Sequence, residues 1–253
     1  MRQRAFLTTL IAILLLAAVI AAGFHAVFTV AYVQASFYTH TPEGDRAAQQ
    51  LKEELNAYLG SSTTFLDLDE VRATAESNPR FRVLSLEKHF PSAIALEIEE
   101  RYAAFAVPSG EGFALVDNDG VRIDEVSSAE SYIELKGDFS VSFVDGRAAG
   151  AYVNELLVMY SSFLQALGEP RANLLSISLV DSGASSRFDQ FCIQTVEGVE
   201  IVIWNPSERP AEAGDAAVQK YLELTETERV RGSIVVQAVS ATGDMNAEYF
   251  SEK

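Results

Sequence analysis

The sequence predicts an α+β protein in which one N-terminal transmembrane helix is followed by two domains outside the cytoplasm. Three observations lead to this prediction. Residues 5–24 carry no charged side chain, helical and strand-like periodicities are mixed along the rest of the chain, and hydrophobic residues make up 48% of its 253 positions. A chain of this length and composition can form one large domain or two small ones with packed cores.

The uncharged segment has the length of a membrane span. About 20 residues of helix rise about 30 Å, which is the thickness of a bilayer's hydrocarbon core. Arg2 and Arg4 precede the segment, and no Lys or Arg follows until Arg46. Because positive charge stays in the cytoplasm, we expect a single-pass type II protein with a cytoplasmic tail at residues 1–4 and a transmembrane helix at 5–26. A cleaved signal peptide is the alternative, although its apolar region would be shorter.

Residues 27–106 are predicted to form a first domain with the order strand, helix, helix, strand, strand. The Val-, Phe- and Tyr-rich residues 25–38 indicate the first strand. Residues 45–60 have a helical apolar stripe, and a second helix follows within residues 66–79, with Asp67 or Asp69 as its N-cap. The stripe consists of Ala47, Leu51, Leu55 and Leu59. Two strands at 80–88 and 93–107 complete a layer of two helices on a three-stranded sheet.

Residues 107–240 are predicted to form a second domain of mixed α/β type. Two strands within 112–124 flank a turn at residues 118–120. Further strands are expected at 132–137, 141–144, 174–180, 190–204 (a hairpin) and 232–239, and helices at 146–170 and 216–229. The apolar stripe of the longer helix consists of Tyr152, Leu156, Tyr160, Phe163 and Leu167. Residues 241–253 are polar, and we expect a frayed tail there.

Charge and cysteine content limit the possible functions. Thirty-six acidic residues against 19 basic ones give a net charge of -17. This charge repels phosphate backbones, so no nucleic acid is expected as a partner. Cys192 is the single cysteine, so no intramolecular disulfide can form. Its apolar neighbours indicate a small buried hydrophobic residue.

No catalytic residue, cofactor site or metal site is predicted. The three histidines, His25, His40 and His89, form no metal-binding pattern, and no nucleophile elbow or phosphate-binding loop is present. The Asp117–Gly120 segment invites comparison with a calcium loop. However, Leu115 and Val126 stand where EF-hand spacing requires ligands, so a turn is the better interpretation.

The run from Thr64 to Arg101 resembles the POTRA domain of the FtsQ/DivIB family of bacterial cell-division proteins. The matching features are the helix entry at residues 65–71, the helix closure at residues 78–79, a Lys-aromatic-Pro element, alternating aliphatic residues and a terminal Glu-Arg pair. The residues that carry the last three are Lys88, Phe90, Pro91, Ile94, Leu96, Ile98, Glu100 and Arg101. Residues 114–124 resemble the strand and turn that open the family's β domain.

This resemblance implies a non-enzymatic divisome scaffold at the division septum. Such a protein binds single-span partners of the FtsL and FtsB/DivIC type outside the membrane and helps coordinate septal peptidoglycan synthesis, while its N-terminal helix lies in the lipid bilayer. The alternative is a membrane-anchored extracytoplasmic enzyme, or a ligand-binding domain of another cell-envelope system. An enzyme should show a pocket with convergent polar groups, whereas a scaffold should show a free sheet edge.

The last expected strand is our candidate partner-binding edge. It is short, apolar and uncharged, and unprotected edges accept a partner strand through main-chain hydrogen bonds. The alternative is an ordinary interior strand. If the family's arrangement holds, Tyr221 and Leu222 lie nearby. The candidate partner-binding residues are Ser233, Ile234, Val235, Val236, Gln237, Ala238 and Tyr221.

Overall fold

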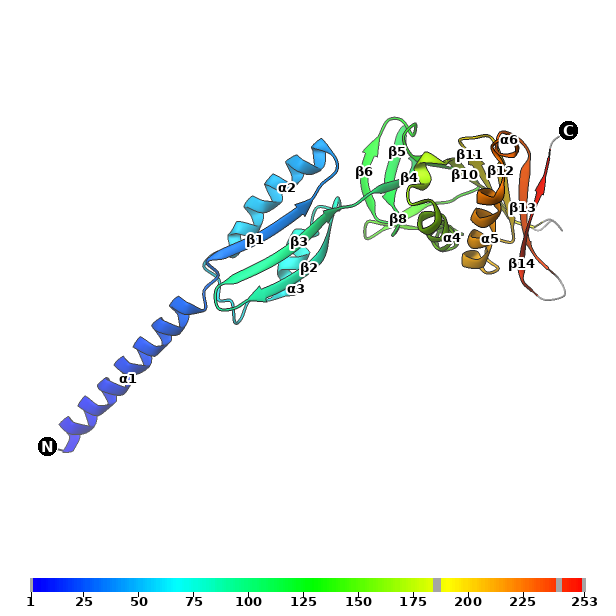
Figure 1. The fold of residues 1–253 in the computed structure, drawn as a ribbon. Helices are drawn as coiled ribbons and strands as arrows, with labels where there is room; N and C mark the ends of the chain where they lie inside the picture. The colour runs from blue at the N-terminus through cyan, green and yellow to red at the C-terminus, as the bar shows by residue number, and fades with distance from the viewer. Residues whose placement is uncertain (1, 184–187, 240–242, 252–253) are drawn as a thin grey trace. The chain divides into compact units, whose positions relative to one another are not determined.

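The computed structural model describes residues 2–183, 188–239 and 243–251, with side chains described from residue 10 onward. The chain divides into two compact units, Met1–Arg101 and Tyr102–Lys253 (Figure 1). The boundary therefore lies at Arg101 and not at residue 106 as expected. The reason is that β4, at Ala103–Ser109, pairs with strands of the second unit and does not continue the preceding strand.

Helix α1 spans Arg2–Val27, and its segment Leu10–Val27 is long and apolar enough to cross a membrane, with a mean hydropathy of 2.6. None of that segment is buried against the protein, which matches a helix whose solvent is lipid. The helix replaces the start of the first expected strand, because the apolar periodicity of residues 25–27 fits either conformation.

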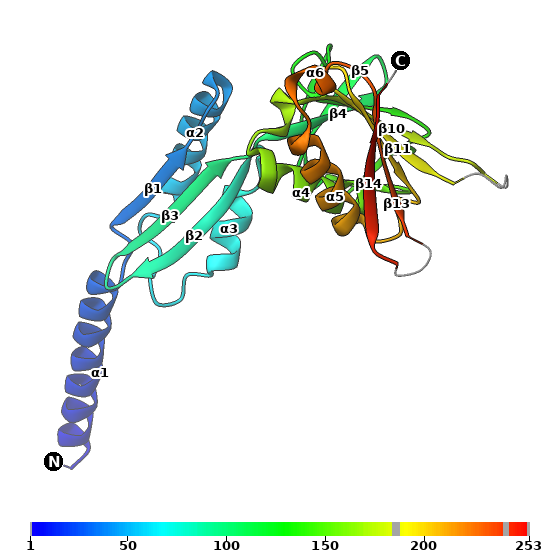
Figure 2. The same ribbon diagram turned by 45° about the vertical axis from the view of Figure 1, so that its right-hand side comes forward.

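The first unit has the predicted order of strand, helix, helix, strand, strand. Its strands pair in the order β1-β3-β2, with β1 parallel to β3 and β2 antiparallel to it. The elements are β1 (Tyr32–Tyr38), α2 (Pro42–Leu55), the short helix η1 (Asn56–Tyr58), α3 (Leu68–Ala75), β2 (Phe81–His89) and β3 (Ala93–Glu100). Figure 2 shows α2 and α3 on one face of this sheet.

Local chemistry explains where these two helices begin. Thr41 caps α2, since its hydroxyl accepts the Gly44 N–H at 2.9 Å, and Pro42 occupies the first turn, where no N–H is needed. Helix α2 therefore starts earlier than expected. Asp67 caps α3, as predicted, by accepting the Asp69 N–H at 2.9 Å. The buried core between the helices and the sheet contains Ala48, Leu51, Leu55, Val71, Ala75, Phe81, Ile94, Leu96 and Ile98.

A buried carboxylate joins the end of β3 to the loop before α2. Glu100 accepts the N–H groups of His40 at 2.8 Å and Thr41 at 3.0 Å. It also accepts hydrogen bonds from the Thr41 hydroxyl and, at 3.1 Å, from Arg80. Burial by itself raises the pKa of Glu100, but the hydrogen bonds from His40, Thr41 and Arg80 outweigh it and lower the pKa below its ordinary value. A Cβ at Gly44 would lie 2.1 Å from this carboxylate, so the site also requires a glycine.

The second unit is built on a nine-stranded mixed sheet. Its strand order is β14-β13-β12-β11-β10-β7-β4-β5-β6, and β8 and β9 form a separate two-stranded sheet. The strands not yet located are β5 (Gly112–Asp117), β6 (Arg122–Val126), β7 (Ile133–Gly137), β8 (Ser142–Val144), β9 (Arg147–Ala149), β10 (Leu174–Val180), β11 (Gln190–Thr195), β12 (Glu200–Trp204), β13 (Ser233–Ala238) and β14 (Met245–Phe250). The mixture of strands and helices confirms the predicted α+β class.

Helices α4 (Val153–Leu167) and α5 (Pro210–Glu223) pack together and cover one face of this sheet (Figures 1 and 2). The short helices η2 (Pro170–Ala172) and α6 (Glu226–Arg229) stand in the connections. The core under the helices includes Phe105, Ile133, Leu156, Phe163, Ile177, Phe191, Ile201, Ile203, Ala217, Ile234 and Val236. Helix α4 begins later than expected, after Tyr152 in the left-handed conformation, and α5 begins earlier than expected, with Pro210 as its first residue.

Gly214 permits the close packing of α4 and α5. A Cβ at this position would lie 2.7 Å from the Met159 carbonyl oxygen and 3.0 Å from the Ser162 Cβ. We expect Gly214→Ala to lower the free energy of unfolding by about 1–2 kcal/mol, because overpacking outweighs the better helix propensity of alanine. Urea titration followed by Trp204 fluorescence measures this. The exposed neighbour provides the control: Asp215→Ala should change stability by about 0.5 kcal/mol or less. Equal stability of the two variants would contradict the packing argument.

Candidate partner-binding edge

Strand β13 is an interior strand, so the expectation that it forms the sheet edge is wrong. It pairs in parallel with β12 and antiparallel with β14, from Ser233↔Phe250 to Ala238↔Met245. The backbone groups on both sides of β13 are therefore engaged within the sheet. Residues 245–250, expected to belong to a frayed tail, instead form β14. The tail residues 241–242 and 252–253 lie outside the described part of the chain, as does Met1 of the expected cytoplasmic tail.

The candidate residues lie on both faces of β13. Ile234 and Val236 are buried in the core, whereas Ser233, Val235 and Ala238 are half-buried and Gln237 is exposed. The structure brings Tyr221 of α5 close to this strand, but in the core and not on the surface. Leu222, beside it, is exposed. A role for these seven residues in partner binding stays a prediction.

A buried polar contact holds Tyr221 in place. Its hydroxyl donates to Glu197 Oε2 at 2.7 Å, and the Arg229 guanidinium lies 5.0 Å from the centre of its ring. Burial and the hydrogen bond to Glu197 raise the pKa of Tyr221 to about 12. The phenol is therefore neutral at physiological pH and anchors α5 beside the hairpin of β11 and β12. This is a structural role.

The terminal strand of the sheet at this side is β14 (Figure 2). Val239 donates its N–H to the Asp244 carbonyl at 2.8 Å, which makes these two residues a hydrogen-bonded pair. Hydrogen-bonded and non-hydrogen-bonded pairs alternate along an antiparallel ladder. The N–H and C=O groups of Met245, Ala247 and Tyr249 consequently point away from β13. Among the described residues, no strand pairs with this side of β14.

The two faces of β14 differ in polarity. The side chains of Met245, Ala247 and Tyr249 pack against the core on the side of α5. The Tyr249 hydroxyl donates to the Arg231 carbonyl at 2.9 Å and fixes the strand to the preceding loop. Asn246, Glu248 and Phe250 lie on the opposite face, where Glu248 and Phe250 are exposed. A strand added to this edge would lie beside apolar side chains on one face of the sheet and beside polar and acidic side chains on the other face.

The sequence contains a strand-like pattern that indicates β14. Met245, Ala247 and Tyr249 share one parity, which is the alternation typical of a half-buried strand. Gly243 and Asp244, just before it, are typical turn residues. The low apolar content of the segment concealed this pattern, since an edge strand buries only part of one face.

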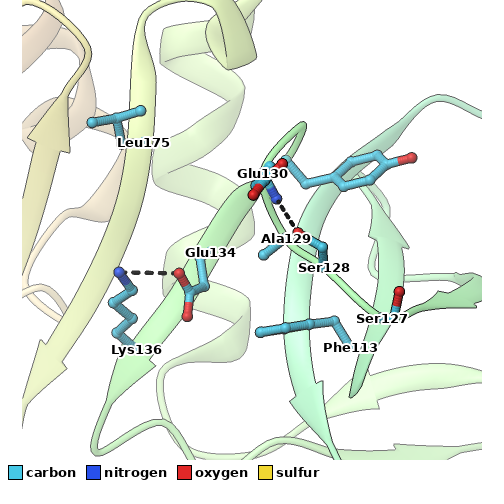
Figure 3. Close-up of a pocket in the computed structure, with 9 residues that line it drawn as sticks. Phe113, Ser127, Ser128, Ala129, Glu130, Glu134, Lys136 and Leu175 are labelled. Carbon is cyan, nitrogen blue, oxygen red and sulfur yellow. Dashed lines mark hydrogen bonds and ion pairs between the residues drawn. The ribbon is translucent and has the colours of Figure 1, made fainter. Parts of the chain in front are cut away.

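A surface pocket of about 450 Å³ lies elsewhere on the second unit, between the segment 127–132 and the strands β5, β7 and β10 (Figure 3). Lys136 and Glu134, which project from β7 into it, form an ion pair at 3.0 Å. The lining residues are Phe113, Ser127, Ser128, Ala129, Glu130, Tyr132, Glu134, Lys136 and Leu175. The lysine and glutamate therefore offset one another's charge, and the lining residues that the structure describes include no histidine or cysteine.

The turn at residues 118–120 forms as predicted. The buried Asp117 carboxylate accepts the N–H groups of Asp119 at 2.9 Å and Val121 at 2.7 Å, so its oxygen closes the turn between β5 and β6. Across the described ranges, no group of three or more His, Cys, Asp and Glu side chains could hold a metal ion.

Comparison with known families agrees with this architecture. Residues 46–101 match the family model described as "POTRA domain, FtsQ-type". The match begins within α2, includes α3, β2 and β3, and ends at the Glu100–Arg101 pair. The N-terminal helix, long and apolar enough to cross a membrane, the FtsQ-type POTRA match and the following mixed sheet fit the class of single-span, POTRA-bearing membrane proteins.

Two relatives share a wider similarity with the chain. The chain is 25% identical over 201 residues to a protein named "Cell division protein FtsQ" from Jannaschia sp. (strain CCS1), which covers 71% of this chain and 63% of that protein. It is 31% identical over 81 residues to a protein of the same name from Streptomyces coelicolor, covering 32% of this chain and 31% of that protein. The matches thus span less than two thirds of each relative. The chain is thus similar to proteins named as cell division protein FtsQ over part of its length, and the FtsQ-type POTRA match lies at residues 46–101.

Proposed function

We propose that this protein is a non-enzymatic scaffold of the division machinery that binds single-span partners of the FtsL and FtsB/DivIC type. Binding would occur outside the membrane and help coordinate septal peptidoglycan synthesis. The observation that carries the proposal is the outer edge of β14. The main-chain groups of Met245, Ala247 and Tyr249 face outward there and pair with no other strand in the described part of the chain. Main-chain pairing with such an edge is a recurring way to bind an extended segment.

The structure of the edge also suggests how it avoids binding other copies of this chain. Glu248 lies at the middle of the strand, so two such edges would place like charges opposite one another. The chain's net charge of -17 adds general repulsion between copies. A partner strand with a basic residue opposite Glu248 and small apolar residues toward α5 would avoid both penalties. The edge therefore favours a heterologous partner over self-association.

The second candidate, an enzyme or ligand-binding domain, would depend on the pocket beside Lys136 and Glu134. A pocket of about 450 Å³ has the size of a small-molecule site. Its paired charges and its serine and aromatic lining suit binding better than catalysis. Compared with the edge of β14, this pocket provides weaker support, because its two neighbouring charges, Lys136 and Glu134, form an ion pair with one another.

The proposed function predicts concentration of the protein at the division site. A fluorescent fusion of the full chain should gather at midcell in dividing cells, with the fluorescent protein on the N-terminus in the cytoplasm. A fusion that carries only residues 1–31 is the matched control, since it keeps the membrane helix without the folded units. Midcell signal that requires the folded units supports the scaffold. A full-length fusion that stays evenly distributed in the membrane would contradict it.

A further inference from the structure

The segment that leaves the membrane helix is hydrogen-bonded to two loops of the first unit. Helix α1 ends at Val27, and the Phe28 carbonyl accepts the Thr63 N–H at 2.8 Å. Val30 donates to the Ser61 carbonyl at 2.8 Å and accepts from Gly60 at 2.9 Å. These contacts attach the loop 59–66 directly to the residues that emerge from the membrane.

The second loop is the turn between β2 and β3. The Ala31 N–H donates to the Ser92 carbonyl at 2.7 Å. The rings of Phe28 and Phe90 meet edge to face, with their centroids 6.4 Å apart. The residues 90–92 are thus held to the same connecting segment as the loop 59–66.

Large apolar side chains are exposed on these two loops and beside them. Phe65 is 82% exposed, Phe90 is 60% exposed, and Leu59 is 45% exposed. Tyr32, the first residue of β1, is 65% exposed. Apart from α1, the other large apolar side chains exposed in the described part of this unit are Tyr38 and Leu84, which lie farther along β1 and β2. An aromatic side chain that is four fifths exposed to water is costly unless something covers it.

The chain's own length places these side chains at the bilayer surface. Four residues, 28–31, connect α1 to β1, and four extended residues span at most about 14 Å. The two loops bond to these connecting residues themselves, so they lie within that distance of the end of the span. Headgroup and interfacial layers extend several ångströms beyond the hydrocarbon core. Aromatic side chains are enriched in this zone, and apolar ones insert there.

The charges nearby indicate how such a contact would be held. Lys88 donates to the Thr64 carbonyl at 3.3 Å, which places its ammonium next to the backbone that leads into Phe65. The acidic Asp67 follows the first loop as the N-cap of α3, and Glu87 lies in β2 before the second loop. Since these residues provide no net positive charge that would attract anionic lipid, insertion would be driven by apolar burial and would depend little on salt.

We propose that the loops at residues 59–66 and 90–92 dock in the outer interfacial zone of the phospholipid bilayer, with Phe65 and Phe90 inserted among the acyl-chain ends. This contact would keep the first unit on the membrane surface, in addition to its covalent connection to α1 through residues 28–31. It goes beyond the proposed scaffold role and does not depend on it. The occupant is lipid, and the competing occupant is a segment of a partner protein.

The test is the environment of residue 65 in protein-free lipid vesicles. The chain has one tryptophan, Trp204, so Phe65→Trp in a Trp204→Phe background gives a single reporter. The full-length variant is reconstituted in vesicles of phosphatidylethanolamine and phosphatidylglycerol, with and without bromine on the acyl chains. We expect blue-shifted emission and at least a twofold loss of fluorescence with brominated lipid, unchanged between low and high salt.

Tyr38→Trp in the same background is the matched control. Tyr38 lies at the far end of β1, six residues or about 20 Å from Tyr32, and its emission should stay that of a water-exposed indole without bromine quenching. Quenching at position 65 but not at 38 supports lipid docking. Equal emission at the two positions, with neither quenched, would overturn the proposal and leave Phe65 to a protein partner. Circular dichroism of each variant in the vesicles verifies that the fold is kept.

Discussion

Glu100→Gln should lower the free energy of unfolding of the first unit by about 3 kcal/mol. The carboxylate is the common acceptor for His40, Thr41 and Arg80, and its side chain has no solvent exposure. Glutamine removes the negative charge that faces the Arg80 guanidinium and replaces one acceptor oxygen by an NH₂ donor, and breaking a buried charge pair in this way typically costs about 3–5 kcal/mol. Urea titration followed by the single tryptophan of the Tyr38→Trp reporter measures the effect on this unit.

The adjacent residue provides the control for this substitution. Glu99 forms an ion pair with Arg82 at 2.7 Å, but both side chains are more than one third exposed. Exposed pairs of this kind contribute about 0–1 kcal/mol, so Glu99→Gln should have a small effect. Similar losses for the two variants would show that the buried hydrogen bonds of Glu100 are not what stabilises the unit.

The stability that Glu100 provides should also depend on pH. Its folded-state pKa lies below the ordinary value of 4.5, because the hydrogen bonds outweigh the effect of burial. The contribution is therefore fully present above pH 4.5 and is lost as the pH falls through the lowered pKa of the folded state. The difference in unfolding free energy between the wild type and Glu100→Gln should be constant near neutral pH and shrink below pH 4.5. A difference that grows on acidification would contradict this sign.

Glu100 also shows which structural features could be predicted from the sequence alone and which could not. The Glu-Arg pair marked the end of the module and its resemblance to a family, and the pattern of alternating residues placed both on a strand. The function of the carboxylate could not be predicted, because its donors His40 and Thr41 lie about 60 positions earlier in the chain. Contacts between residues this far apart in sequence depend on the parallel pairing of β1 with β3, which no local pattern specifies.

Local signals were reliable where one short-range interaction decides the structure. The Asp67 cap and the Asp117 turn are of this kind, since each carboxylate bonds an N–H two residues away. The boundary between the units was misplaced because the strand-like pattern of residues 93–107 contains no glycine, proline or turn cluster at Arg101 and Tyr102 that would separate two strands. That pattern reports which residues are half-buried, but it does not report which sheet buries them.

The sheet edge was misassigned for a related reason. Strand β13 is apolar because it lies between β12 and β14, and its apolar composition was itself evidence for an interior strand. A free edge usually carries polar or charged residues, which protect it from unwanted pairing. Strand β14, with Asn246 and Glu248, has this composition. The candidate edge is therefore β14, which follows β13 after a turn, and not β13 itself.

Ala247→Pro should abolish capture of FtsL- and FtsB-like partners while leaving the sheet folded. The Ala247 N–H points outward, so proline there removes a donor that a partner strand would use and places its ring against the incoming backbone. Proline is tolerated on an edge strand when the missing N–H faces solvent. We expect the dissociation constant for the partners to rise at least tenfold, which corresponds to about 1.4 kcal/mol. Pull-down and titration with the full-length protein in detergent micelles measure this.

Two further variants locate the contact on the sheet. Ala247→Val keeps the N–H and favours the extended backbone, so it should retain partner capture. Val235→Asp places a charge on the open face of the sheet, opposite Glu248 of β14, while the outward main-chain groups of β14 stay unchanged because the backbone of Val235 lies between β12 and β14. Loss of capture in Ala247→Pro but not in Val235→Asp supports strand addition at β14. The opposite pattern, with Trp204 fluorescence showing both variants folded, would move the contact to the open face and would contradict binding at the edge.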